Sequence, residues 1–140
     1  MPRKKQLERD VIFANRIFLI RCEGKNSVKV CDNFFGLIEK YEEKIRKLMD
    51  FCDVPEQVIL NFKKGDKTIS GLYYVQTKEV SKHLIVVDIY IRPLFGLSKK
   101  ERNISLIDSF VHEVIHHKYR DENKTDAKTK EYIEKKLGLF

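Results

Sequence analysis

The chain has 140 residues, of which 42% are hydrophobic and 35% charged, and its net charge is +7. This length suits one domain with a buried core and is short for two, so residues 1–140 are interpreted as a single domain. No apolar run is long enough to span a bilayer, and no signal-type apolar segment follows the basic N-terminus. These features exclude a membrane-spanning chain and favour a cytoplasmic protein.

The first half of the chain combines predicted helices with one strand. Residues 4–14 are expected to form a short helix, in a segment (residues 1–15) that is peripheral to the domain or frayed. The run RIFLIRCE, residues 16–23, is apolar and partly β-branched, which predicts a strand. From residue 28 to about residue 49 apolar side chains recur at helical spacing, which predicts a long amphipathic helix ending before Pro55.

The second half begins with three predicted strands and returns to helix. The strands lie in QVILNFKK, TISGLYYVQT and SKHLIVVDIYIRP, with a turn around Gly65 between the first two. A helix follows over residues 97–120, with Ser98 and Glu101 spaced as a capping box, and a last helix covers about residues 125–137. The expected fold class is α+β: a small, mainly antiparallel sheet packed with an amphipathic helix and the helix over residues 97–120.

Charge and cysteine content give weaker indications of partners. Most lysines alternate with glutamates, as in EKYEEKIRK, which is typical of a solvated helix face, so nucleic acid is a candidate partner with little support. The three cysteines are odd in number and lack CxxC spacing. They are expected to be reduced, partly buried thiols and not metal ligands, with a Cys22–Cys31 disulfide left open.

The helix over residues 97–120 contains HEVIH, residues 112–116. His112 and His116 lie four residues apart, on one helical face, so both imidazoles can bind a single zinc ion. Glu113 is one position further round, where its carboxylate can take a proton from water that attacks a carbonyl. The spacing H-E-x-x-H therefore predicts a zinc site with Glu113 as the general base.

HEVIHH on a helix that follows the strand LIVVDIYI resembles the small zincin-type metallopeptidases. The resemblance is to compact, gluzincin-like cytosolic forms related to SprT-like and phage-repressor-cleaving peptidases. It covers about residues 71–137, and only the five-residue motif is specific. It implies a zincin-like minimal domain that holds Zn²⁺ on His112 and His116, with a last ligand from a further helix. It also implies that the strand within residues 83–91 binds extended peptide substrates along an exposed edge.

The third zinc ligand departs from the patterns of these families. Metzincins place a glycine three residues and a histidine six residues after the second motif histidine, where this chain has Tyr119 and Glu122. SprT-like proteins use a later histidine, and none follows His117. The N-E-x-x-x-D pattern of thermolysin-like enzymes is absent too. An acidic residue is therefore expected to complete the site, and the candidates are Asp121, Glu122, Asp126, Glu131 and Glu134.

Helical spacing ranks these carboxylates. At about 100° per residue, Asp126 coincides with the apolar stripe of the last helix, whereas Glu131 and Glu134 turn toward solvent. A carboxylate on a buried face needs a partner, and zinc would be that partner. Asp126 is therefore the predicted third ligand and Glu122 the runner-up. Asp126 also suits the N-terminal turn of a helix capped by Asn123, and the two roles are compatible.

Three functional hypotheses follow. The first is a zinc-dependent metallopeptidase that hydrolyses peptide or protein substrates, with a metal-activated water and Glu113 as base. The alternative is a weakly active or inactive zincin-like binding module that acts on nucleic acid or a protein partner through its basic surface. A deformylase-like amidase fits poorly, because RCEGKN does not match the Gly-Cys-Leu type motif that supplies a cysteine ligand in such enzymes.

Overall fold

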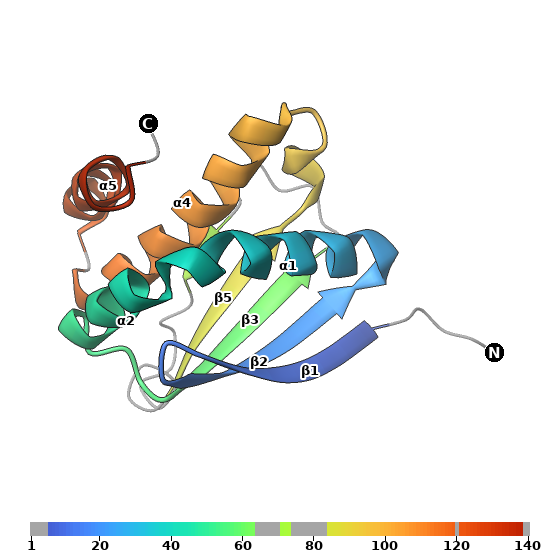
Figure 1. Ribbon diagram of the computed structural model, residues 1–140, viewed down its shortest axis with the longest axis horizontal. Coiled ribbons are helices and arrows are strands. Elements are labelled where there is room, and N and C mark those ends of the chain that lie inside the picture. Colours follow the sequence, from blue (N-terminus) through green and yellow to red (C-terminus); the bar gives the residue numbers. More distant parts are fainter. Residues whose placement is uncertain (1–5, 64–70, 74–83, 120, 139–140) are drawn as a thin grey trace.

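The computed structural model describes residues 6–63, 71–73, 84–119 and 121–138. Helices α1 and α4 cross one face of a five-stranded sheet, and α5 packs against α4 (Figure 1). The strands are β1 (Gln6–Phe13), β2 (Arg16–Glu23), β3 (Gln57–Lys63), β4 (Gly71–Tyr73) and β5 (Leu84–Tyr90). The α-helices are α1 (Gly24–Ile38), α2 (Glu42–Phe51), α4 (Lys99–Lys118) and α5 (Glu122–Glu131).

The expected α+β class is confirmed, with a sheet that is mixed in direction. The strand order is β1-β2-β3-β5-β4. The two outer pairs, β1–β2 and β4–β5, are antiparallel, whereas β2–β3 and β3–β5 are parallel. The parallel centre differs from the mainly antiparallel sheet expected. For β2 and β3 the reason is the helical connection through α1 and α2, because a crossover of that length returns the chain to the same end of the sheet.

The prediction of a helix over residues 4–14 is wrong, because residues 6–13 form strand β1. This strand pairs with β2 along its whole length through a two-residue turn at Ala14 and Asn15. Both turn residues have positive φ, 54° and 61°, as a type I′ hairpin turn requires. That turn usually carries glycine, so Ala-Asn gave no hairpin signal. Residues 6–13 are consequently an integral edge strand of the sheet rather than a peripheral or frayed piece.

The long helix expected over residues 28–49 is divided into α1 and α2 by a 3₁₀ turn, Glu39–Tyr41. Tyr41 leaves helical geometry, with φ −108° and ψ 14°. The buried positions Phe34, Ile38, Ile45 and Met49 are nevertheless spaced by four, seven and four residues. The spacing therefore continues through the turn as if one helix were present, which explains why the sequence did not show the division.

The core lies between the sheet and the helices α1 and α4. Phe18 from β2, Phe34 from α1 and Phe110 from α4 are fully buried. The rings of Phe34 and Phe110 pack edge to face with centroids 5.4 Å apart, a favourable geometry for aromatic pairs. Because this cluster fixes the apolar face of α4, it also fixes the direction of the polar residues on the same helix. Cys22, Cys31 and Cys52 are buried free thiols, as expected.

The start of α4 matches its prediction. Ser98 is the N-cap, its hydroxyl accepts from the Glu101 amide, and the Glu101 carboxylate accepts from the Ser98 amide. The other expected strand residues, among them His83, lie outside the described residues. Within the described ranges, no helix has the length and apolar content needed to cross a membrane.

Candidate metal centre

Helix α4 places the two motif histidines on one face, near its C-terminal end. The ring centroids of His112 and His116 are 5.6 Å apart, and the side chains are 20% and 14% exposed. The opposite face of the same turns contains Val111, Val114 and Ile115, all buried in the core. The imidazoles are therefore held on a rigid, anchored element and remain accessible from outside.

The chain reverses direction directly after α4. Tyr119 caps the helix in an extended conformation, with φ −109° and ψ 116°, and α5 begins at Glu122 with Asp121 as its N-cap. The Tyr119 carbonyl accepts a hydrogen bond from the Thr125 hydroxyl at 2.8 Å, which ties the turn to the first turn of α5. This reversal brings the N-terminus of α5 back against the two histidines.

Glu122 is the carboxylate that the reversal places between the histidines. Its Oε1 lies 3.3 Å from His112 Nε2, and its Oε2 lies 3.2 Å from His116 Nε2. One ligand atom from each of the three residues falls within 4.8 Å of the others. Two atoms bound to a tetrahedral zinc ion at about 2.1 Å lie roughly 3.4 Å apart. The two nitrogen–oxygen distances are close to this value, so the three residues could hold a metal ion such as zinc.

The second nitrogen of each imidazole faces an oxygen acceptor. His116 Nδ1 lies 2.9 Å from the Tyr119 carbonyl, and His112 Nδ1 lies 3.3 Å from Asp126 Oδ1. A neutral imidazole that donates from Nδ1 leaves the Nε2 lone pair free to bind a metal. Such outer contacts are typical of zinc-binding histidines, because they fix the tautomer and the ring orientation. With the proton of each ring on Nδ1, both Nε2 lone pairs would face Glu122, as metal binding requires.

The structure brings Glu122, the runner-up, to the Nε2 atoms, whereas Asp126 contacts the other nitrogen of His112. Asp126 was expected on a buried face, but its side chain is 66% exposed. The buried residues of this segment are Thr125, Thr129, Ile133 and Leu137. The error arose from projecting the stripe back from residues 133 and 137 at ordinary helical spacing. Residues Tyr132–Lys136 form a wider π turn, with the Leu137 amide bonded to the Tyr132 carbonyl.

Two sequence signals favoured Glu122. It stands six residues after His116, where metzincins place their third histidine. Asp121 is also a good N-cap, and its Oδ1 accepts a hydrogen bond from the Asn123 amide. α5 therefore begins at residue 122 rather than near residue 125. The hydroxyls of Thr125 and Thr129 donate to backbone carbonyls, which allows these polar residues to take the buried positions that apolar residues were expected to fill.

Glu113 lies beside His112 and is almost completely buried, with 1% of its surface exposed. Among the residues described, no hydrogen-bond partner satisfies its Oε1. Burial raises the pKa of this carboxyl to about 8, with smaller contributions from the negative charges of Glu122 and Asp88. A buried carboxyl group of this kind, beside a cluster that could hold a metal ion, is a candidate for proton transfer.

The expectation about substrate pairing needs a correction. The strand before the metal helix, β5, is not an edge strand, because β3 pairs with one side and β4 pairs with the other at Val87–Ile89. Among the described strands, the edge next to α4 is β4, which runs antiparallel to β5 and contacts α4. An extended peptide that joins the sheet on this side would therefore pair with β4.

Comparisons with protein-family models, with curated proteins and with solved structures found no significant match to this chain. The interpretation of the centre accordingly depends on its residues and their geometry.

Proposed function

We propose that the chain is a zinc-dependent metallopeptidase of the H-E-x-x-H type. The observation that carries this proposal is the convergence of three side chains next to a buried carboxyl group. His112 Nε2, His116 Nε2 and the Glu122 carboxylate approach one another at metal-ligand spacing, and Glu113 follows His112 on the same helix. In this proposal His112, His116 and Glu122 hold the zinc, and the small zincin-type metallopeptidases remain the family that the motif resembles.

The chemistry divides between the metal and the protein. Zinc, when bound, supplies Lewis acidity, which lowers the pKa of water and polarises a peptide carbonyl. Glu113 accepts the proton that water loses and then delivers it to the leaving amine. Its burial suits this role, because desolvation raises the pKa of the carboxyl group and so favours its uptake of a proton. Asp126 and the Tyr119 carbonyl hold the histidine rings in place.

Substrates of this enzyme are extended peptide segments. The unpaired side of β4 is the nearest sheet edge to α4 among the described residues. Edge pairing uses main-chain hydrogen bonds, so it selects an extended conformation more strongly than a sequence. We therefore expect broad cleavage of unfolded protein and poor cleavage of compact, folded domains.

A second candidate is a zincin-like binding module without strong catalysis. The observation that favours it is the exposure of Glu122, whose side chain is 64% exposed. A third ligand that the surrounding protein does not hold in place would lower the affinity for the metal. This reading predicts salt-dependent binding of DNA by the zinc-free protein, because the net charge is +7.

The experiment compares Glu113→Gln with the wild type. The zinc content of each protein is measured together with cleavage of a fluorescein-labelled, unfolded casein. We expect about one zinc per chain in both proteins and cleavage by the wild type alone. Glu131→Gln, the same chemical change at an exposed position on α5, is the control and should retain full activity. Equal cleavage by wild type and Glu113→Gln would remove Glu113 from the mechanism, and zinc-loaded wild type without cleavage would favour the binding module.

A further inference from the structure

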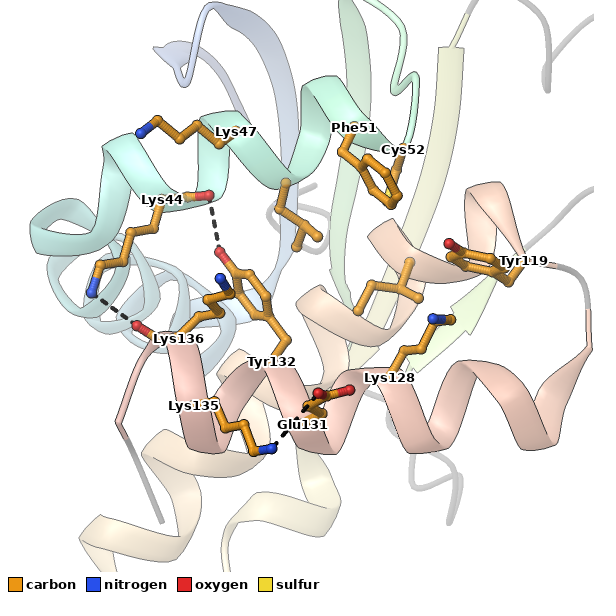
Figure 2. Close-up of a pocket in the computed structure, with 12 residues that line it drawn as sticks. Lys44, Lys47, Phe51, Cys52, Tyr119, Lys128, Glu131, Tyr132, Lys135 and Lys136 are labelled. Atoms are coloured by element: carbon orange, nitrogen blue, oxygen red, sulfur yellow. Dashed lines mark hydrogen bonds and ion pairs between the residues drawn. The ribbon is translucent and has the colours of Figure 1, made fainter.

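A groove of about 920 Å³ lies between α2 and α5, on the side of α5 that faces α2 (Figure 2). Its floor is apolar and aromatic, and it is formed by Leu48, Phe51, Ile115, Tyr119 and Tyr132. Phe51 is 59% exposed although it is a large apolar side chain. Burying such a ring is favourable, so this apolar floor offers a partner a surface to cover.

Lysines line the groove on both sides. Lys44 and Lys47 come from α2, and Lys128, Lys135 and Lys136 come from α5 and the π turn that follows it. Glu131 is the one acidic residue in the lining, and it already pairs with Lys135 at 3.9 Å. Five ammonium groups against one carboxylate make the groove complementary to an acidic ligand.

One end of the groove is closed by contacts between its two walls. The Tyr132 hydroxyl donates to the Lys44 carbonyl at 2.9 Å, and Lys44 Nζ donates to the Lys136 carbonyl at 2.8 Å (Figure 2). These hydrogen bonds hold α2 and the π turn at a fixed separation. The groove is therefore formed before a ligand arrives, which reduces the entropy that binding must overcome.

At the other end of the groove, lysine ammonium groups lie over the faces of two aromatic rings. Lys118 Nζ lies 4.8 Å from the Phe51 ring centroid, and Lys128 Nζ lies 4.8 Å from that of Tyr119. Lys124 Nζ also covers Tyr119, at 5.4 Å. Nucleic-acid bases stack on open aromatic faces, so this arrangement disfavours a single-stranded nucleic acid. It suits carboxylates, which can pair with the ammonium groups while apolar side chains reach the floor.

We propose that this groove binds an acidic, amphipathic helical segment of a partner protein. Helix-in-groove recognition uses an apolar stripe against an apolar floor, and the flanking acidic residues would pair with the lysines of the two walls. The proposal does not rest on the peptidase function, because none of the groove residues is a metal ligand or the proposed base. The groove nevertheless shares Tyr119 with the turn that holds His116.

The test measures fluorescence anisotropy of a labelled helix-forming peptide of about four turns, with leucine on one face and glutamate elsewhere. A peptide with lysine in place of each glutamate and a labelled oligo-dT are the comparison ligands. The double variant Lys47→Glu/Lys128→Glu changes one residue on each wall. Its control, Lys25→Glu/Lys29→Glu, makes the same change in charge at exposed positions on α1.

We expect saturable binding of the acidic peptide that is weakened at least about tenfold in the groove variant and less than about twofold in the α1 control. Phe51→Ser should also weaken binding, because it removes floor area without changing charge. The double variant His112→Ala/His116→Ala should bind the acidic peptide with wild-type affinity. This result would show that the groove binds its partner whether or not the metal centre is intact. Absence of saturable binding, or equal weakening in the α1 control, overturns the proposal. Loss of oligo-dT binding alone in the groove variant makes nucleic acid the occupant and overturns it too.

Discussion

Helix α4 has two faces with opposite energetics. One face buries Phe110, Val111 and Val114 against the sheet and α1, where each apolar side chain gains free energy from leaving water. The other presents His112 and His116, and between the two faces Glu113 buries a carboxyl group at 1% exposure. Among the described residues one of its oxygens has no hydrogen-bond partner, so this burial costs free energy. The apolar face stabilises the fold, whereas Glu113 is retained at the expense of stability.

The difference indicates where function lies. A leucine or methionine in place of Glu113 would fill the same volume without the desolvation cost, so packing alone does not explain a carboxyl group there. A role in proton exchange beside a metal ion would explain why a destabilising carboxyl group is kept at this position. Substitutions on the apolar face and at Glu113 should therefore change stability in opposite directions.

The largest effect is expected on the apolar face. Phe110→Ala removes a fully buried ring that packs against Phe18 and Phe34. The free energy of unfolding should fall by about 3–5 kcal/mol, because a large cavity is left in the core. Urea denaturation followed by circular dichroism measures this change. A loss below about 1 kcal/mol would mean that the face contributes far less than its burial indicates.

The opposite effect on stability is expected at Glu113, which lies between the two faces of α4. Glu113 keeps its proton up to about pH 8 in the folded, zinc-free protein, whereas its ordinary pKa is 4.5. From pH 4.5 to pH 8 the unfolded chain has lost this proton and the folded chain retains it, so stability falls as pH rises through this window. Glu113→Gln lacks this titration. It should therefore be more stable than the wild type at pH 8, on the order of a few kcal/mol, and nearly equal to it at pH 4.

Urea denaturation of the two zinc-free proteins at both pH values measures the difference. Glu131→Gln is the matched control, because Glu131 is exposed, and its stability should follow that of the wild type. If Glu113→Gln and the wild type differ by the same amount at pH 4 and pH 8, burial does not perturb the Glu113 carboxyl group.

The smallest effect is expected at the start of α4, which supports both faces equally. Ser98→Ala removes the hydroxyl of the capping box and should cost about 1 kcal/mol. The cap lowers the pKa of Glu101 through its hydrogen bonds with Ser98. The stabilisation by Glu101 is therefore present above its ordinary pKa and is lost as pH falls through the lowered value. A cost that stays the same down to pH 2 would show that the Glu101 carboxylate takes no part.

The apolar face of α4, its capping box and both motif histidines could be predicted from the sequence, because each depends on residues within a few turns of one another. Ser98 and Glu101 are three residues apart, and His112 and His116 are four. The strands β2 and β3 were also predictable from their composition. Such local patterns carry their own geometry, so the structure adds little to them.

The sequence could not identify the carboxylate that lies nearest the two Nε2 atoms, because its position depends on a turn and on helix phase. The extended Tyr119 and the N-cap at Asp121 set where α5 begins. The π turn over Tyr132–Lys136 changes the angular relation between Ile133 or Leu137 and the residues before them. Neither feature has a strong sequence signal. The β1–β2 hairpin was missed for a similar reason, since its turn uses Ala14 and Asn15 without glycine.

The measurement that tests the centre most directly is zinc titration of three proteins by isothermal calorimetry: the wild type, Glu122→Ala and Asp126→Ala. The wild type should bind one zinc per chain. Glu122→Ala loses a proposed ligand and should show the greatest fall in zinc affinity. Asp126→Ala loses only a contact to His112 Nδ1, and its zinc affinity should fall by about 10–100-fold. Wild-type affinity in Glu122→Ala, or a greater loss in Asp126→Ala than in Glu122→Ala, would contradict the proposed ligand set.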